Sequence, residues 1–172
     1  SGKRIYYARI IPYRGYWLEF RCDIADTISA IVDRRKTFLA TQILRMFGLS
    51  SNEDIYNRFS EKPYPEIVNT IRKDSTSNKE EAFLDFYKKM RPTEPVTLEA
   101  AKEVFRRMFR DNRRYDLGRV GRYMINKKLA LNTSLNKRVL DLDTVIEVIR
   151  NLLSVKAGGK NTDDIDHLSN RR

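Results

Sequence analysis

The sequence has few of the residues that most catalytic and metal-binding sites require. Among 172 residues there is one cysteine, Cys22, and one histidine, His167. A single cysteine excludes a disulfide within the chain, and the scarcity of both residue types excludes zinc fingers, Cys–His triads and HExxH sites. Cys22 falls in a strand-like segment, which predicts a buried, unreactive thiol in a reducing compartment.

Long apolar runs and nucleotide-binding glycine loops are also missing. No stretch approaches the roughly 18 uncharged apolar residues of a membrane-spanning helix, and the first residues lack the apolar run of a secretory signal. Residues 118–121 (GRVG) are neither a Walker loop nor a dinucleotide fingerprint. The sequence therefore predicts neither membrane insertion nor nucleotide hydrolysis.

Positive charge is present in excess and is unevenly distributed. The formal net charge is +11 and the sequence pI is near 9.8. Residues 1–40 carry a net charge of +4 and residues 101–140 a net charge of +9, whereas the rest of the chain is slightly acidic. Two separated basic segments favour a polyanionic partner, nucleic acid more readily than a membrane.

The N-terminal part is rich in β-branched and aromatic residues. This composition predicts strands over residues 5–11, 16–22 and 27–32, with the turn signal PYRG at 12–15 joining the first two into a hairpin. After Asp33 the apolar period becomes helical. We therefore expect an antiparallel sheet at the start of the chain.

Helical periodicity and helix-end signals mark the remainder of the chain. Gly48 is placed to end a first helix, and Ser51 and Thr97 are candidate N-caps. The predicted fold class is α+β, mostly helical, with a short N-terminal antiparallel sheet followed by five or six helices. The helices are expected up to residue 48 and over residues 51–59, 66–72, 79–90, 97–110 and 141–155.

The segment 97–110 has the clearest helical pattern, and one of its faces is basic. Lys102, Arg106 and Arg110 recur at i, i+4 and i+8, which places them on one side of a helix. Guanidinium groups suit contact with phosphate or with a partner's carboxylate, but the same residues also fit a solvated face. The candidate basic surface consists of Lys102, Arg106, Arg110, Arg113, Arg114, Arg119, Arg122, Lys127 and Lys128.

Two further groups of residues each have two interpretations. Tyr13 and Trp17, beside Arg9 and Arg14, offer a stacking platform for an unpaired base or belong to the core of the sheet. The cluster Asp163, Asp164, Asp166 and His167 offers ligands for a divalent cation or forms a capped turn that orients Arg171 and Arg172.

Several motifs together point to one protein family. They are ARIIPYRGYWLEF at 8–20, DRRK at 33–36, MRPTEP at 90–95, RYDL at 114–117, VGRY at 120–123, NKKL at 126–129 and DDIDHL at 163–168. Their order and approximate spacing resemble the β subunit of bacterial RNA polymerase, and the resemblance covers almost the whole chain.

The resemblance implies that the chain is the lobe of that subunit, one wall of the cleft that holds downstream DNA. It implies a single domain over 1–172, with a strand-rich part (1–35), a helical part (36–157) and a C-terminal loop (158–172) that leads back to the rest of the subunit. The chain then begins and ends within a larger polypeptide, in the compact form without the long insertion that some members carry around 59–65.

The same resemblance implies an activity for the whole enzyme and none for this piece alone. The enzyme is a DNA-directed RNA polymerase, a nucleotidyltransferase, whose Mg²⁺ is bound by another subunit, so this fragment has no cofactor and no catalytic residue of its own. The implied partners are downstream duplex DNA, the non-template strand, other polymerase subunits, sigma factor and other transcription factors. The implied location is cytoplasmic, in association with the nucleoid.

For DNA contact, the resemblance implies a pocket for a non-template base. The matching positions are Arg9, Ile165, Asp166 and Arg171, with Asp166 accepting from a guanine edge and the arginines supplying donors. Two departures bear on this surface: Ser169 stands where the family usually has glycine, and Thr37-Phe38-Leu39 stands where it commonly continues with a basic residue and proline.

Two rival functions from other classes remain open at this stage. One is a free-standing basic module that docks an acidic protein partner without nucleic acid. The other is a small metal-dependent hydrolase built on Asp163, Asp164, Asp166 and His167.

Overall fold

The computed structural model describes residues 4–159, in which four strands precede seven helices. The strands are β1 (Tyr6–Ile10), β2 (Leu18–Cys22), β3 (Ile28–Val32) and β4 (Lys36–Leu39). The helices are α1 (Ala40–Phe47), α2 (Asn52–Arg58), α3 (Pro65–Lys73), α4 (Lys79–Met90), α5 (Leu98–Phe109), α6 (Arg119–Leu129) and α7 (Leu142–Lys156).

The strands form one antiparallel sheet in the order β1-β2-β3-β4. Leu18, Phe20 and Cys22 of β2 are buried and lie opposite the buried residues Val32, Ala30 and Ile28 of β3. Because successive side chains point to opposite faces, this register places these six apolar residues on the same side of the sheet. The alternation thus builds one apolar face.

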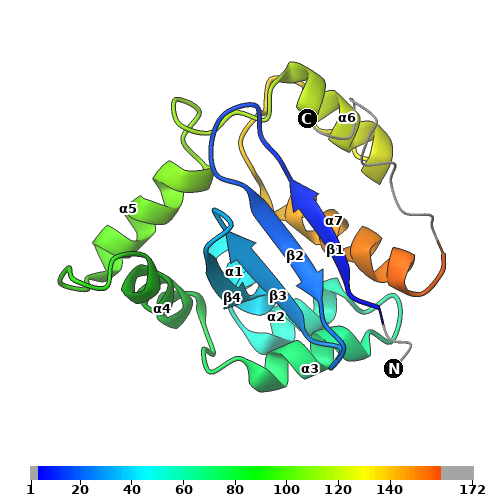
Figure 1. Ribbon diagram of the computed structural model, residues 1–172, viewed down its shortest axis with the longest axis horizontal. Helices are drawn as coiled ribbons and strands as arrows, with labels where there is room; N and C mark the ends of the chain where they lie inside the picture. The colour runs from blue at the N-terminus through cyan, green and yellow to red at the C-terminus, as the bar shows by residue number, and fades with distance from the viewer. Residues whose placement is uncertain (1–3, 160–172) are drawn as a thin grey trace.

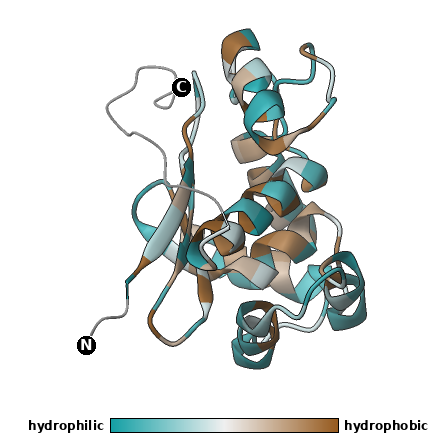
Figure 2. Ribbon diagram, turned by 90° about the vertical axis from the view of Figure 1, so that its right-hand side faces the viewer, coloured by the Kyte–Doolittle hydropathy of each residue, from teal (hydrophilic) through white to brown (hydrophobic). Residues whose placement is uncertain are grey.

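All helices lie on that apolar side of the sheet, as Figures 1 and 2 show. The α7 helix packs on β1 and β2, α1 packs on β3 and β4, and α3 packs on β3. The opposite face of the sheet carries no helix among the described residues. None of the helices described is both long enough and apolar enough to cross a membrane.

A chain of aromatic rings joins α1, α4 and α5. The Phe105 ring meets Phe47 at a centroid distance of 4.9 Å and Phe83 at 5.5 Å, both edge to face, and also lies 5.5 Å from Phe109. Edge-to-face pairs set the positive ring edge against the negative ring face, which adds to the area buried. These rings fix α5, and with it the basic helix face, onto the body of the domain.

The predicted fold class is confirmed, and so are several of its local signals. The Thr97 side chain caps α5 by accepting from the amide of Ala100, and the Ser51 side chain caps α2 by accepting from Asp54. Gly48 follows α1 with a φ of 137°, as expected of a glycine at a helix end. Cys22 is buried, and burial raises the pKa of its thiol to about 11.

Residues 36–39, which we predicted to open the first helix, instead form β4. Val32 and Arg35 flank a tight hairpin turn in which Asp33 and Arg34 have φ values of 54° and 61°. Two consecutive positive φ angles are typical of a type I′ turn, whose backbone twist fits that of the two strands it joins. The usual sequence signal for this turn is Asn-Gly or Asp-Gly, which is absent here. Arg34 is held there by Trp17, whose ring centroid lies 3.5 Å from the guanidinium carbon.

The helix α6 was also missed, so the described residues contain seven helices rather than five or six. Gly118 precedes α6 and offers no side-chain cap, Gly121 lies inside it, and the helix ends at Ala130 in the left-handed conformation. A glycine inside a helix lowers helix propensity, and glycine rather than alanine is the expected residue at a left-handed helix end. Tertiary contacts of Arg122, described below, stabilise this helix instead.

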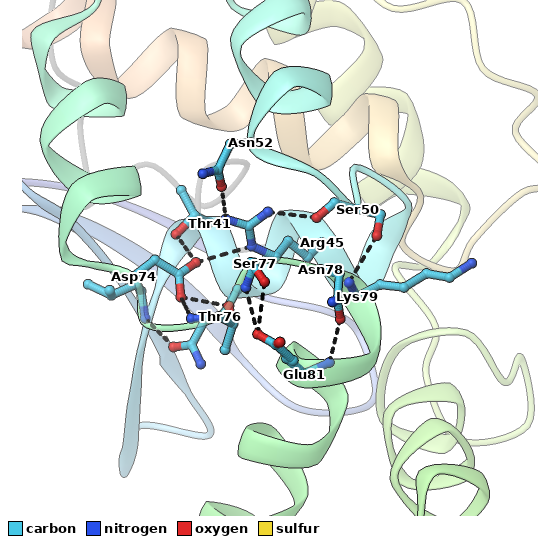
Figure 3. A network of polar contacts seen from close by, with 12 residues as sticks. Thr41, Arg45, Ser50, Asn52, Asp74, Thr76, Ser77, Asn78, Lys79 and Glu81 are labelled. Atoms are coloured by element: carbon cyan, nitrogen blue, oxygen red, sulfur yellow. Dashed lines mark hydrogen bonds and ion pairs between the residues drawn. The ribbon is translucent and has the colours of Figure 1, made fainter.

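A buried ion pair ties α1 to the end of α3 and to the start of α2 (Figure 3). The Arg45 side chain is fully buried, and its Nε lies 3.3 Å from Oδ2 of Asp74, which is also buried. Arg45 also donates to the Ser50 carbonyl oxygen at 2.6 Å and to the side chain of Asn52. Asp74 accepts further hydrogen bonds from Thr41 and Thr76, so almost every polar atom of the pair has a partner.

We expect Asp74→Ala to lower the free energy of unfolding by about 3–5 kcal/mol, because it leaves the Arg45 charge buried without its carboxylate. Urea unfolding of the purified chain measures this loss. The matched control is Asp143→Ala, which removes an ion pair with Arg58 whose aspartate side chain is 70% exposed. That change is expected to cost no more than about 1 kcal/mol. Equal losses in the two variants would contradict a structural role for the buried pair.

Candidate nucleic-acid interface

The two basic segments of the sequence meet at one end of the molecule. In Figure 1 the loop between β1 and β2 runs beside the loop between α5 and α6. The Arg14 amide donates to the Asp116 carbonyl oxygen at 3.0 Å, and the Asp116 amide donates to the Arg14 carbonyl oxygen at 2.8 Å. These two hydrogen bonds form an antiparallel bridge between residues about one hundred positions apart.

A third segment joins the bridge. The Asp116 carboxylate accepts from the Gly118 amide at 2.7 Å and forms an ion pair with Arg138, whose Nε lies 3.2 Å away. The Leu117 amide donates to the Arg138 carbonyl oxygen at 2.8 Å. We call the resulting surface the basic end; it comprises the exposed residues Tyr13, Arg14, Arg113, Arg114, Arg119 and Arg138. Asp116 thus fixes charged residues from three parts of the chain.

Gly15 allows the two loops to approach this closely. Its φ is 124°, and a Cβ at this position would lie 2.8 Å from Cδ2 of the buried Tyr115 ring and 3.2 Å from the Arg114 carbonyl oxygen. Only glycine adopts such a conformation without strain. The PYRG turn therefore has a second role: its glycine packs against the tyrosine of the RYDL motif.

Overlapping the basic end, four arginines surround two carboxylates. Nε and Nη2 of Arg106 donate to Glu103 at 2.9 and 2.8 Å, and Nε of Arg107 donates to it at 3.0 Å. Asp111 accepts from the Arg113 amide at 3.0 Å and lies 3.8 Å from both Arg106 and Arg114. We call this group the arginine cluster: Glu103, Arg106, Arg107, Asp111, Arg113 and Arg114, which line an open hollow.

The two carboxylates of the arginine cluster stay ionised. Hydrogen bonds from Arg106 and Arg107 lower the pKa of Glu103 to about 2. The amide and the charge of Arg113 lower the pKa of Asp111. The four arginine side chains are 47–83% exposed, so the cluster has a net positive charge and is open to an anion. This is the chemistry of a site for phosphate oxygens.

The predicted basic face of α5 is present at the surface. Lys102, Arg106 and Arg110 are all exposed, and the Arg110 guanidinium lies 5.9 Å from the ring centroid of Phe47. Arg106, however, is engaged by Glu103 and Asp111. The face therefore continues into the arginine cluster rather than standing as an independent row of free cations.

Arg122 does not belong to the candidate basic surface, and its assignment there was wrong. Its side chain is fully buried between α6 and α7. It donates to Oδ1 of Asn126 at 3.2 Å and to Oγ1 of Thr144 at 2.8 Å. Burial lowers the pKa of the guanidinium. The other α6 residues of the predicted surface, Arg119, Lys127 and Lys128, are exposed.

The predicted stacking platform divides into two places. Tyr13 is 78% exposed at the basic end, next to Arg14. Trp17 is half-buried on the open face of the sheet, and Arg34 covers its ring. On the same face Arg9 forms an ion pair with Glu19 at 2.9 Å and lies 4.9 Å from the Tyr7 ring centroid. Neither aromatic side chain belongs to the apolar core.

Comparison with known proteins places the chain in a family. The family described as RNA polymerase Rpb2, domain 2, matches residues 1–172. The chain is 38% identical to the DNA-directed RNA polymerase subunit beta of Prochlorococcus marinus (strain NATL1A), and 40% identical to those of Syntrophomonas wolfei and Synechocystis. Each match covers 100% of this chain and 15–16% of the relative. The chain belongs to the Rpb2 domain 2 family.

The resemblance inferred from the motifs is thereby confirmed for the whole Rpb2 domain 2 chain. The chain spans about one sixth of the length of these relatives. Asp163, Asp164, Ile165, Asp166, His167, Ser169 and Arg171 lie outside the described residues. Within residues 4–159, no three His, Cys, Asp or Glu side chains gather where they would hold a metal ion.

Sequence patterns identified most of these arginines but not what holds them together. Arg14 and Arg138 of this Rpb2 domain 2 chain carry no motif that marks them as neighbours of Asp116. The available signals were the high charge of residues 101–140 and the turn motif at 12–15. The bridge itself depends on folding of the chain between them.

We expect Gly15→Ala to destabilise the domain by about 1–3 kcal/mol more than Gly158→Ala does, because only the first change adds a clash to the strain of a positive φ. Gly158 has a φ of 83° and open space around its Cβ position, which makes it the matched control. Urea unfolding of both variants measures the difference. Similar losses would show that the Gly15–Tyr115 contact does not hold the loops together.

Proposed function

We propose that this chain is a DNA-contacting, non-catalytic domain of the β subunit of a bacterial DNA-directed RNA polymerase, and forms one wall of its downstream DNA cleft. The observation that carries the proposal is the convergence of the two basic segments through the Arg14–Asp116 bridge. Family membership supports it, since the relatives named above are polymerase β subunits.

The proposed contribution of the basic end is electrostatic and positional. Guanidinium groups on loops that are fixed relative to one another contact phosphate oxygens of the duplex without reading its sequence. The arginine cluster extends this surface, because Glu103 and Asp111 restrain its four arginines in advance of binding. The duplex is held in place while other parts of the enzyme carry out nucleotide addition.

A second proposed contact involves the non-template strand. Arg9 lies on the open face of the sheet, where its side chain is 46% exposed and its guanidinium is paired with Glu19. Together with Ile165, Asp166 and Arg171, it would form the pocket for a non-template base that the family resemblance implies. Trp17, which directly precedes β2, and Arg34, in the turn between β3 and β4, contact each other and would border this pocket.

The remaining functional assignments follow from the proposed place in the enzyme. We propose that the Mg²⁺ of the polymerase is bound by another subunit, so that no step of nucleotide transfer uses a residue of this chain. Sigma factor and other transcription factors are proposed partners of the assembled enzyme, as are its other subunits. The proposed location is the cytoplasm, on the nucleoid.

The electrostatic role predicts how DNA binding depends on salt. For Arg113→Gln with Arg114→Gln, we expect the slope of the logarithm of the binding constant against the logarithm of salt concentration to fall by about two, because roughly one counterion is released per phosphate contact. Fluorescence anisotropy with a labelled duplex measures the slope. Circular dichroism checks that the variant is folded.

The matched control is Lys62→Gln with Arg72→Gln, which removes the same charge at exposed positions near α3, on the opposite side of the molecule from the basic end in Figure 1. Its salt slope is expected to change by less than about one. Equal changes in the two double variants would show that net charge alone, and not the basic end, determines binding.

Membership of a polymerase predicts the behaviour of the native protein. An antibody raised to this domain should precipitate from cell extract a chain far larger than 20.3 kDa, together with other large chains and template-dependent RNA synthesis. Sizing of the reactive chain and an RNA synthesis assay of the eluate provide the measurement. A lone chain near 20 kDa without RNA synthesis would refute the proposal and favour a module that docks an acidic protein.

A further inference from the structure

The two edges of the sheet differ in how their backbone groups are satisfied. At the β4 edge, side chains occupy the outward groups. The Leu39 amide donates to Oε1 of Gln42 at 3.0 Å. Nζ of Lys89 donates to the Thr37 carbonyl oxygen at 3.4 Å and lies 5.0 Å from the ring centroid of Phe38. A lysine on an edge strand is a common way of preventing another strand from pairing there, so the β4 edge is blocked.

The strand register shows which peptide groups of β1 face the other edge. Residues of a central antiparallel strand bond alternately to the neighbour on one side and to the neighbour on the other. The Asp33 amide donates to the Trp17 carbonyl oxygen at 3.0 Å, so the odd-numbered residues of β2 bond to β3 and its even-numbered residues bond to β1. The even-numbered residues of β1 are their partners. The N–H and C=O groups of Tyr7 and Arg9 therefore point away from the sheet.

These outward groups have no partner in the part of the chain that the structure describes. The strand β1 is outermost in the sheet, as Figure 1 shows, and no backbone hydrogen bond from residues 4–159 reaches Tyr7 or Arg9 from that side. The Arg9 side chain does not cover the edge, because it pairs with Glu19 on the adjacent strand β2. Two N–H and two C=O groups are thus available for pairing.

The apolar layer of the domain is also incomplete at the β1 edge. The core-facing residues of β2 are fully buried. Tyr6 and Ala8, on the same side of the sheet, are only half-buried, although α7 packs against β1. A further strand would cover both residues. Because alternate side chains point to opposite faces, it would place apolar residues beside Tyr6 and Ala8, and polar residues on the open face beside Tyr7 and Arg9.

The size of the relatives indicates where such a strand comes from. This chain covers only 15–16% of the polypeptides that it matches, so most of such a polypeptide lies outside it. A segment of the same polypeptide is already tethered to the domain. It therefore has a high effective concentration at the edge and loses less entropy on pairing than a separate molecule does.

We propose that the β1 edge pairs with a strand of the same polypeptide that lies outside residues 1–172 and alternates between apolar and polar residues. Its backbone bonds to Tyr7 and Arg9, and its apolar side chains complete the layer over α7. This fifth strand joins the domain to the rest of the subunit and fixes the β1–β2 loop, which carries Arg14. The proposal rests on family membership and does not depend on the proposed contact with DNA.

The first test is hydrogen exchange at single-residue resolution in the full-length protein. If the edge is paired, the amides of Tyr7 and Arg9 should exchange at least about a hundredfold more slowly than those of an unstructured peptide, as the Ala8 amide does through its bond to β2. A free edge gives an alternating pattern, in which Ala8 is slow and both of its neighbours are fast. That pattern would overturn the proposal.

The second test identifies the source of the strand. The photo-cross-linking residue p-benzoylphenylalanine replaces Tyr7, which is 54% exposed and would lie beside a side chain of the added strand. In the full-length protein, the cross-linked peptide should come from outside residues 1–172, and the product should keep the mass of a single chain. Cross-links to a second copy or to a different protein, or only to residues within 1–172, would refute a strand of the same polypeptide.

The third test removes one outward amide. Proline is tolerated on an edge strand where the lost N–H faces solvent, but not where that N–H is paired. In the full-length protein, Tyr7→Pro should accelerate exchange of the Arg9 amide at least about tenfold. The Phe20 amide, which bonds to β1, should stay within about threefold and thereby show that β1 remains paired with β2.

The matched control is Thr37→Pro, which removes an outward amide from the blocked edge strand β4. Exchange of the Arg9 amide is expected to stay within about twofold of its rate in the unmodified protein, because β4 is separated from β1 by two strands. An Arg9 rate that Tyr7→Pro leaves unchanged, or that both variants raise equally, would contradict a strand docked on β1.

Discussion

Two backbone hydrogen bonds between Arg14 and Asp116 hold together the segments in which the positive charge of the chain is concentrated. Positive loops that approach one another repel, and an exposed ion pair would contribute too little to fix their register. The bridge uses peptide groups, which carry no net charge, and leaves the guanidinium groups of Arg14, Arg113 and Arg114 at the surface. The basic end therefore depends on an uncharged constraint, to which the Asp116 carboxylate adds Arg138.

Two arginines are buried and serve the interior of the domain rather than its surface. Arg45 is paired with Asp74 and stabilises the helical body, whereas Arg122 donates to the neutral oxygens of Asn126 and Thr144 and holds α6 against α7. In both cases one planar guanidinium reaches several segments, which a single lysine ammonium with its compact charge does less well. The net charge of residues 101–140 thus overstates what the surface presents, because part of it is structural.

Local sequence signals correctly predicted the features that depend only on neighbouring residues, such as helix caps and helix ends. Thr97 caps α5 and Gly48 ends α1 because cap geometry involves only neighbouring residues. The strand β4 was missed because its turn places Arg34 in a left-handed conformation that Trp17, far from it in the sequence and just before β2, stabilises. Arg122 is buried against Thr144, which is 22 positions further along the chain, and helical periodicity cannot predict a contact of this kind. The candidate site was thus predicted as a set of charges, but its arrangement required the tertiary structure.

The carboxylates in the arginine cluster explain how so many cations are held ready for an anion. The low pKa of Glu103, about 2, keeps it ionised throughout the neutral range, so its hold on Arg106 and Arg107 does not vary with pH there. Side chains ordered in the free protein lose less entropy on binding. The negative charge of the same carboxylates weakens the attraction of the cluster for phosphate. A surface built in this way gains defined geometry at the expense of strength, which suits the proposed role of positioning DNA while still letting it move.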